Sequence, residues 1–256
     1  MQNKPWLALA ALLFAVSAEA AASAGSVTLL TGRGTASSAD GTIRALAKGA
    51  DVFAGEVINT GPNSYANLRF RDGSFILLRP NSRFQIEQYE YQGETVPSSK
   101  TASQASQPST PSTATASSGS GSGDEDVGRA FFRLLKGGFR AVTGLVGKVD
   151  RNAYRVAPPV ATIGIRGTDY VVVLCDLACN ADPVIANNLP AGSAPAGGVV
   201  VGVITGGVFV ANNAGGSVDV GQDQYLVTLP DGTQVELPAQ PRFLRVDPIP
   251  NPESCE

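Results

Sequence analysis

Hydrophobic and polar positions alternate one by one in parts of the chain before residue 97. Residues 66–71 show this period of two, which is typical of a strand with one buried face. Asp72-Gly73 is a turn signal, and the apolar residues 75–78 follow it directly. The pattern therefore predicts a β-hairpin.

Further strands are predicted on both sides of this hairpin. In residues 84–91 the alternation slips between Ile86 and Tyr89, which predicts a β-bulge. Shorter apolar runs bounded by turn residues predict the other strands, at residues 27–31, 43–46, 57–60, 139–143, 154–157, 161–165, 170–175, 199–204, 208–212, 218–220, 224–229 and 233–237.

One segment has helical periodicity instead. The acidic residues 124–126 suit a helix N-terminus, and Gly137-Gly138 is a stop signal. Between them the apolar residues recur at helical spacing, at Val127, Ala130, Phe131, Leu134 and Leu135. We therefore expect one short helix here. Together, these elements predict a mainly β protein, a sandwich or roll of many short strands. A β-solenoid-like arrangement is the alternative, although no fixed repeat period is present.

Residues 97–123 separate two β-rich parts and consist largely of Ser, Thr, Pro and Gly. Such a segment buries too little apolar surface to offset its ordering entropy, so we expect it to be disordered. The predicted organisation is a leader at residues 1–24, a β domain at 25–96, this linker or insertion, and a second β-rich part at 124–256. The two parts either pack as one unit or form independent domains.

The N-terminus has the pattern of a secretory signal. Lys4 supplies the positive charge, residues 6–16 are apolar, and Ala18-Glu19-Ala20 is a small-x-small cleavage site. Ala22-Ser23-Ala24 is a second possible site. The apolar run is about half as long as a membrane-spanning helix needs, so we expect cleavage and a periplasmic or secreted protein without a transmembrane segment.

Export gives the three cysteines, Cys175, Cys179 and Cys255, an oxidising environment. On a continuous strand, Cys175 and Cys179 would lie about 13 Å apart, too far for a disulfide. The strand must therefore end near Cys175 if these two are bonded, and Asp176 and Asn180 favour such a turn. We favour a Cys175–Cys179 bridge with Cys255 free or intermolecular; a bond from one of the pair to Cys255 is the alternative.

The amino-acid composition excludes several kinds of catalytic and metal site. The 256 residues contain no histidine, which excludes His-based acid–base catalysis, Ser–His–Asp or Cys–His triads and imidazole-held metals. No other catalytic constellation stands out, so we expect no enzyme activity, no cofactor and no metal site. The formal net charge of −3 does not favour nucleic-acid binding.

Positive charge is nevertheless concentrated locally. Residues 129–166 contain eight basic residues and one acidic residue, whereas the segment from Asp219 to the end is acidic. An anion-binding face for an envelope polymer would use Arg129, Arg133, Lys136, Arg140, Lys148, Arg151 and Arg155. Ordinary solvated β residues, balanced by the acidic segment, are the alternative and the one we favour.

The order of several short motifs before residue 97 resembles the FecR domain, the periplasmic part of ferric-citrate-type regulators. The matching residues are Gly25-Ser26-Val27, residues 48–51, residues 57–60, the Asp72-Gly73-Ser74 turn with the alternating residues before it, and Ser82-x-Phe84-x-Ile86. After the linker, residues 135–145, 202–206 and 220–222 resemble the continuation found in exported, stand-alone FecR-domain proteins.

The most specific match is the string from Ala161 to Asp169, with Thr162, Gly164, Arg166, Gly167, Thr168 and Asp169. A phosphate-binding loop would need a helix after the glycines, but residues 170–174 have a strand pattern. We therefore interpret the string as structural, with glycines at a tight bend and Arg166 paired with Asp169.

The resemblance implies a non-enzymatic exported binding module that engages an envelope component or a protein partner not named by the sequence. Regulators of this family also carry a cytoplasmic segment and a membrane helix, and only five residues precede the apolar run here. We therefore do not expect this chain to signal across the membrane by itself. The alternatives are an accessory role in cell-surface iron signalling with a sigma factor and a TonB-type receptor, and a His-free carboxylate enzyme acting on envelope glycans.

Overall fold

The structure is a computed structural model, and it describes residues 22–93, 127–165 and 167–245. The expected leader, apart from residues 22–24, and the expected linker at 97–123 lie outside the described residues, as do Arg166 and Cys255.

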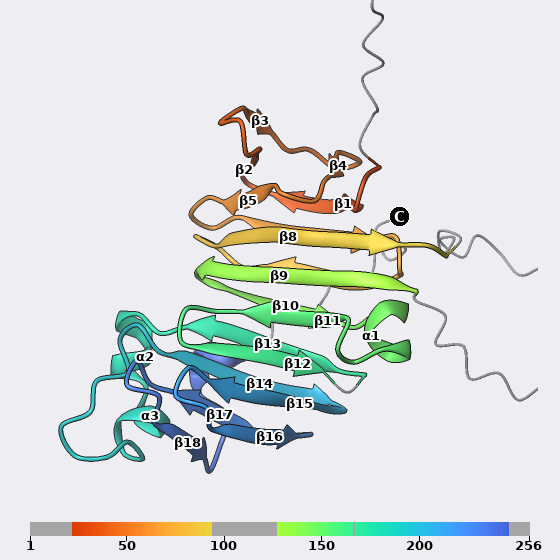
Figure 1. Cartoon of the computed structure of the whole chain (residues 1–256). Coiled ribbons are helices and arrows are strands. Elements are labelled where there is room, and N and C mark those ends of the chain that lie inside the picture. The colour runs from red at the N-terminus through yellow and green to blue at the C-terminus, as the bar shows by residue number, and fades with distance from the viewer. Residues whose placement is uncertain (1–21, 94–126, 166, 246–256) are drawn as a thin grey trace, which may run out of the picture.

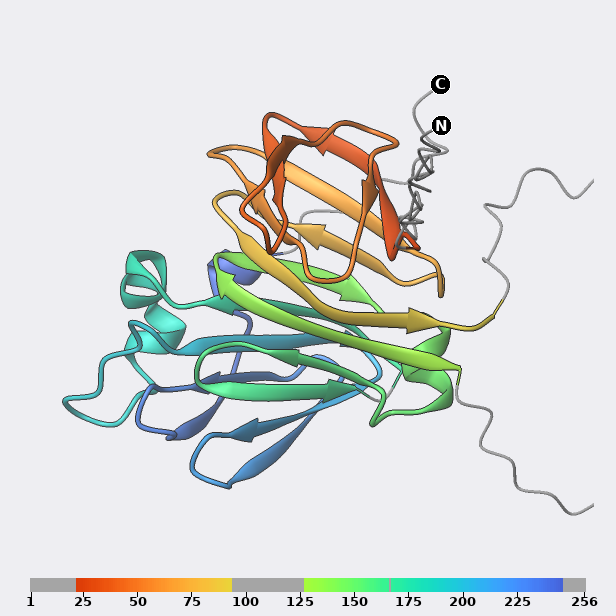
Figure 2. The same ribbon diagram turned by 45° about the horizontal axis from the view of Figure 1, so that its top comes forward.

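Two nine-stranded sheets pack face to face (Figures 1 and 2). In spatial order, sheet A consists of β4 (Asp51–Val52), β1 (Gly25–Thr31), β6 (Tyr65–Phe70), β7 (Phe75–Leu78), β10 (Gly138–Val142), β13 (Asp169–Leu174), β14 (Val199–Thr205), β17 (Tyr225–Thr228) and β18 (Gln234–Leu237). Sheet B consists of β3 (Ile43–Ala45), β2 (Gly34–Ser37), β5 (Val57–Thr60), β8 (Arg83–Tyr91), β9 (Gly128–Lys136), β11 (Tyr154–Ala157), β12 (Ala161–Ile165), β15 (Gly207–Asn212) and β16 (Ser217–Gly221).

The expected mainly β, layered fold is confirmed. After the first strands, the spatial order in each sheet follows the order of the chain, so the molecule builds up from β3 and β4 at one end to β16 and β18 at the other (Figure 1). Among the described residues, the strand ladders are antiparallel except that between β9 and β11, which is parallel. The chain therefore combines a sandwich with the one-directional progression of a solenoid.

The local predictions hold where alternation or a turn signal supports them. Strands β6 and β7 form the expected antiparallel hairpin, with Gly73 at a positive φ of 82° in its turn. The ladder between β8 and β9 shifts register between Ile86 and Gln88, as the slipped alternation predicted.

The helix expected at residues 127–135 is wrong, because residues 128–136 form strand β9. Ala130, Phe132 and Leu134 point into the core at every second position, while Arg129 and Arg133 point to solvent. The α-helices of the described residues are all short: α1 (Leu145–Val149), α2 (Leu177–Ala181) and α3 (Pro183–Ala186).

The core between the sheets contains aromatic side chains from both sides of the linker. The ring centroid of Phe132 in β9 lies 5.1 Å from that of Phe70 and 5.4 Å from that of Phe84. It also lies 5.6 Å from the ring of Tyr154 in β11. Because both sheets and this core combine strands from residues 25–91 and 128–237, the two β-rich parts share one hydrophobic interior.

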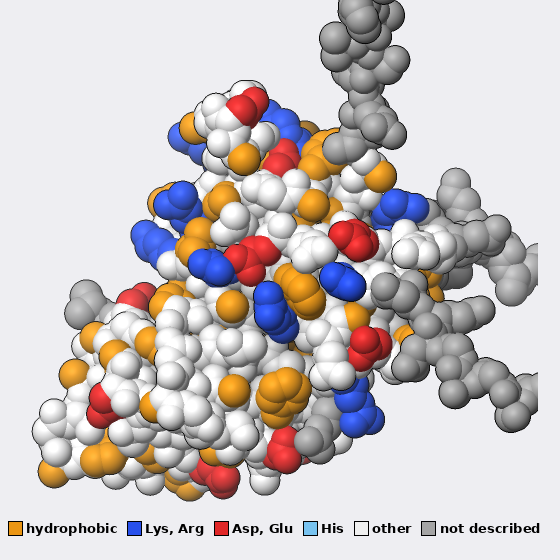
Figure 3. Space-filling model, viewed as in Figure 1, with side chains coloured by type: hydrophobic (Ala, Val, Ile, Leu, Met, Phe, Trp, Pro, Cys, Tyr) orange, Lys and Arg blue, Asp and Glu red, His pale blue; other side chains and the backbone are white. Residues whose placement is uncertain are grey.

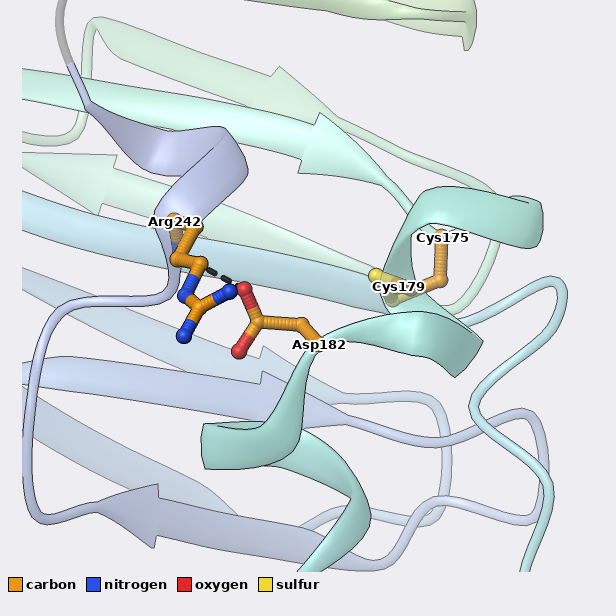
Figure 4. Close-up of a disulfide and its surroundings, with 4 residues drawn as sticks. All are labelled: Cys175, Cys179, Asp182 and Arg242. Carbon is orange, nitrogen blue, oxygen red and sulfur yellow. Dashed lines mark hydrogen bonds between the residues drawn. A yellow bond between two sulfur atoms is a disulfide. The ribbon is translucent and has the colours of Figure 1, made fainter.

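A second hydrophobic cluster covers part of the outer face of sheet A. Helices α2 and α3 and the 3-10 helix η1 (Arg242–Leu244) pack there, contributing Cys179, Ile185 and Leu244. The expected Cys175–Cys179 disulfide is present, and the chain turns through α2 to form it (Figure 4). Asp182 caps α3 by accepting from Val184 N, and its other oxygen accepts a 2.6 Å bond from Arg242 N.

Candidate binding face on sheet B

The outer face of sheet B, in contrast, presents side chains to solvent (Figure 3). On β9, the outward positions hold the exposed Arg129 and Arg133, with the half-buried Phe131 between them. On the parallel neighbour β11, Arg155 is exposed and lies opposite Phe131. Alternation along each strand places these side chains on one face, away from the core.

A row of side chains crosses this face at right angles to the strands. Strand registers join Gln88 to Phe131, Phe131 to Arg155 and Arg155 to Gly164. The row continues from Gly164 to Phe209 on β15. We call Phe131, Arg155, Gly164 and Phe209 the aromatic row. The two strands that carry its rings, β9 and β15, are three strand spacings apart, about 14 Å.

Contacts within the aromatic row hold its members in place. The guanidinium carbon of Arg155 lies 4.2 Å from the centroid of the Phe131 ring, a cation–π contact. The ring of Phe209 lies over Gly164, where an added Cβ would be 2.0 Å from Cε1 and 2.1 Å from Cζ. Glycine is therefore required beneath this ring.

A groove runs beside the aromatic row. Its cavity has a volume of about 360 Å³, and its lining residues are Arg133, Leu134, Leu135, Ala157, Pro158, Pro159, Ala161, Thr162 and Asn213. Asn213 Nδ2 donates a 3.0 Å bond to Pro159 O, which fixes the turn between β11 and β12 against the loop after β15. Arg133 is the one charged residue of this lining. It pairs with Glu87 at 2.6 Å while its own side chain stays half exposed.

The seven basic residues considered from sequence do not share a single face. Arg129, Arg133 and Arg155 lie together on the outside of sheet B, and Lys136 is at the end of β9. Lys148 lies on α1 and the exposed Arg151 in the turn after it. Arg140 belongs to sheet A, where its guanidinium forms a bidentate pair with Asp169, with bonds of 2.9 and 2.7 Å.

The string from Ala161 to Asp169 links sheet B to sheet A, and its first two residues line the groove. Thr162 and Gly164 lie on β12, and Asp169 begins β13. Between them, Thr168 N donates to Thr143 Oγ1, and Thr143 Oγ1 in turn donates to Thr168 O. Asp169, which the sequence suggested as the partner of Arg166, forms its ion pair with Arg140. Gly167 has a positive φ of 71° at this crossing, and a strand follows it rather than a helix.

A second cleft, on sheet A, has a volume of about 530 Å³ and is lined by Arg140, Val203, Ile204, Asp223, Tyr225, Gln240 and Arg245. Its arginines are matched by carboxylates, since Asp169 pairs with Arg140 and Asp223 shares the lining with Arg245. Partial burial and the charge of Asp223 raise the pKa of Tyr225. This cleft therefore offers no excess of positive charge.

One buried carboxylate lies between the sheets. Asp72 Oδ1 accepts from Ser74 N, Ser74 Oγ and Tyr89 Oη at 3.1, 2.7 and 3.1 Å. Burial, and secondly the Asp72 charge, raise the pKa of Tyr89 well above its ordinary value. This network stabilises the β6–β7 turn. Among the described residues, no group of three or more His, Cys, Asp or Glu side chains could hold a metal ion.

The sequence pattern does not predict the aromatic residues of the candidate face. It places Phe131 on the apolar side of a helix and Phe209 on an ordinary strand, whereas both lie at outward positions on strands of sheet B. Phe131 and Leu135 carry the signal that could have identified this face. Both are apolar, although strict alternation along β9 would place polar side chains at these outward positions.

Comparison with known proteins identifies no family for this chain. No family model and no curated protein matches the chain. Two crystal structures described as a "putative anti-sigma factor from Parabacteroides distasonis" are similar in part. They are 11% and 10% identical to this chain, with TM-scores of 0.40 and 0.39. Each alignment covers 70% of this chain and 58% of the other. The two-sheet architecture is defined by the strand pairing of this chain alone.

Within the part of the chain that the structure describes, no helix has the length and apolar character needed to cross a membrane.

Proposed function

We propose that this protein is an exported, non-enzymatic binding module of the FecR-like type, and that it holds an envelope component on the outer face of sheet B. The observation that carries this proposal is an asymmetry between the two outer faces. The second hydrophobic cluster covers the outer face of β13, β14 and β17 in sheet A, whereas β9, β11 and β15 of sheet B carry partly exposed rings and arginines on their outer face. Exposed aromatic and arginine side chains held by their neighbours are typical of binding surfaces.

The FecR-like assignment is supported by the residues that carry the sequence resemblance. Asp72, Gly73 and Ser74 form the hydrogen-bonded turn between β6 and β7, and the string from Ala161 to Asp169 forms the crossing from sheet B to sheet A. Both motifs serve the fold, so a chain that keeps them can vary its exposed faces. A non-enzymatic role is in keeping with a sequence without histidine.

Export is supported by the leader pattern at residues 1–24 and by the disulfide, a bond that persists mainly in oxidising compartments.

The test is retention on isolated cell envelopes. The protein without its leader is mixed with the envelope fraction of its own source, and the fraction is sedimented. We expect the protein to sediment with the envelope, and a double variant, Phe131→Ala with Arg155→Ala, to stay largely in the supernatant. The control is Phe75→Ala with Arg69→Ala, which removes another arginine–ring contact, 5.1 Å long, on the outer face of sheet A. Equal retention of the native protein and the sheet B variant would refute the proposal.

An accessory role in surface signalling is the other function that the FecR resemblance implies. The two solved structures described as anti-sigma factors concern other proteins, and at their TM-scores they add no weight to this role. A neighbouring pair of genes for a sigma factor and a TonB-dependent receptor would favour it. Binding of the exported chain to the periplasmic part of such a receptor would then be the direct measurement.

A further inference from the structure

We infer that the candidate face binds a linear polysaccharide that carries widely spaced anionic groups, and that the polymer lies across the strands in the groove beside the aromatic row. This inference rests on the proposed function and specifies its ligand class. It is carried by three features: the shape of the groove, the chemistry of its two borders and the sparse placement of its positive charge.

The shape fits an extended chain. Leu135, Pro158 and Pro159 form an apolar wall of the groove. The aromatic row runs alongside, since Phe131 and Arg155 are each two residues along their strands from the lining residues Arg133 and Ala157. Small side chains form the floor of the groove, Ala157 on β11 and Thr162 on β12, and Thr162 lies opposite Ala211 on β15. The floor thus crosses several strands without a large side chain to block it, which suits a ligand longer than a single small molecule.

The borders suit sugar rings. A pyranose ring has two apolar faces of C–H groups and a rim of hydroxyl groups, so it stacks on an aromatic ring while its rim is hydrogen-bonded. Phe131 and Phe209 are both half-buried, and each is fixed by a neighbour, Arg155 in one case and Gly164 in the other. Rings held in advance lose little conformational entropy when a ligand stacks on them. The hydroxyl of Thr162 and the amide of Asn213 offer hydrogen bonds from the lining.

The sparse positive charge at the groove determines which class of polymer it suits. Arg133 lines the groove and Arg155 borders it, and no carboxylate residue belongs to the lining. A guanidinium group binds a carboxylate or a phosphate ester through two parallel hydrogen bonds. However, Glu87 already neutralises part of the charge of Arg133, and Glu90 lies opposite Arg129. The face therefore suits one anionic group in every few sugars better than a phosphate on every residue of a nucleic acid.

The experiment measures binding of the full chain without its leader to defined polymers by titration calorimetry. Hyaluronan, with one carboxylate in every two sugars, is the test ligand. Dextran is the neutral sugar polymer, poly-glutamate the anionic peptide, and oligo-dT the nucleic acid. We expect hyaluronan to bind at least about tenfold more tightly than each of the other three. Equal or tighter binding of any of them would overturn the inference.

Variants then place the site. We expect Phe131→Ala and Arg155→Ala each to weaken hyaluronan binding about tenfold. Arg155→Lys should lose part of the affinity, because lysine keeps the charge but not the planar fork. Phe53→Ala and Lys48→Ala are matched controls at the other end of the molecule and should bind as the native chain does. Melting curves of all variants show whether each is folded, and Arg155→Lys provides a mild change if Arg155→Ala does not fold.

The outcomes separate the inference from the proposed function. Retention on envelopes that depends on Phe131 and Arg155, without binding of hyaluronan, would leave the binding module in place and refute the polysaccharide. Loss of both envelope retention and hyaluronan binding would refute the proposed function and the inference together. Binding of hyaluronan that is unchanged in Phe131→Ala and Arg155→Lys would refute the groove as its site.

Discussion

The ring of Phe209 lies directly over Gly164 on the outside of sheet B, so close that a Cβ on residue 164 would be 2.0 Å from Cε1 of the ring. The two residues lie opposite each other on neighbouring antiparallel strands, β12 and β15. Gly164 has no positive φ, so the requirement for glycine comes from the ring above it and not from the backbone. This relationship connects a residue of the most specific sequence motif to the candidate binding face.

The first prediction concerns this contact. Gly164→Ala should force the Phe209 ring away from the sheet and lower the free energy of unfolding by about 1–3 kcal/mol, as overpacking does. Chemical denaturation measures the loss. The double variant Gly164→Ala with Phe209→Ala should recover part of it, because the clash is gone. Gly207→Ala is the control, since its Cβ would meet only Val220 O at 3.5 Å. Additive effects of the two substitutions would contradict the contact.

The second prediction concerns the shared core. Phe132 is fully buried and contacts rings from strands on both sides of the linker. Phe132→Ala should therefore lower the free energy of unfolding by about 3–5 kcal/mol. The protein should still unfold in a single transition, because the two β-rich parts share both sheets.

The neighbouring residue provides the control for this prediction. Phe131 points outward, so Phe131→Ala should cost clearly less, about 1 kcal/mol for its contact with Arg155. Two separate unfolding transitions in either variant would show that the β-rich parts are independent.

The sequence pattern predicts most strands of this protein well, but it does not predict how they are arranged in the two sheets. Alternation identified β6 and, where it slips, the bulge of β8, because one face of such a strand lies toward the core. The turn signal at Asp72-Gly73 and the apolar run after it identified β7. Which sheet a strand joins depends on contacts across the core, and no local pattern contains that information. Thus the chain leaves sheet A at the end of β14 and enters sheet B at β15, with only Gly206 between them.

The error at residues 127–135 and the omission of the candidate face have the same physical cause. Phe131 and Leu135 are apolar side chains on the solvent side of β9. Added to the core residues Ala130 and Leu134, they produce a helical spacing. A strand with an apolar outer face does not alternate, so the apolar residues of the candidate face also conceal the strand.

The third prediction concerns pH. Burial raises the pKa of Tyr154 and of Tyr170, whose hydroxyl oxygens lie 3.1 Å apart, and burial with the Asp72 charge raises that of Tyr89. In the unfolded chain these phenols ionise near pH 10, whereas in the folded chain they stay neutral. Stability is therefore complete below about pH 10 and falls above it, by up to about 1.4 kcal/mol per pH unit for each phenol.

Denaturation curves measured across this range test the dependence on pH. Tyr89→Phe removes one of these buried phenols, so it should make the fall shallower. Tyr65→Phe is the control, because this phenol is only partly buried. A native protein whose stability is constant above pH 10 would contradict neutral buried phenols.

The fourth prediction concerns the disulfide. Cys175 and Cys179 hold α2 in the second cluster, and replacing both with serine should cost about 2 kcal/mol for so short a loop. Amide exchange should become faster in α2 and α3, while the strands of the main core remain protected.

Tryptic digestion without reductant checks the pairing directly. No Lys or Arg lies between residues 167 and 241, so both cysteines stay in one peptide, and Cys255 falls in the peptide 246–256. Release of that peptide with a free thiol is the expected result. Its attachment to the larger peptide would support the alternative pairing with Cys255.

The fifth prediction concerns the start of the exported chain. Two cleavage sites fit the sequence, after Ala20 and after Ala24, but Ala24 is only 2% exposed and belongs to the core. Its N–H donates to Val52 O at 2.8 Å, and its carbonyl accepts from Arg71 N at 3.0 Å. Each such bond contributes about 1 kcal/mol, and removing Ala24 would also open a small cavity. We therefore expect the mature chain to begin at Ala21.

The intact mass of the protein recovered from the periplasm or the medium identifies its first residue. The stabilities of two shortened chains show whether the contacts of Ala24 matter, independently of the protease that cleaves the leader. A chain that begins at Gly25 should unfold at least about 2 kcal/mol more easily than one that begins at Ala21. Equal stability of the two chains, or a natural product that begins at Gly25, would show that the contacts of Ala24 do not select the cleavage site.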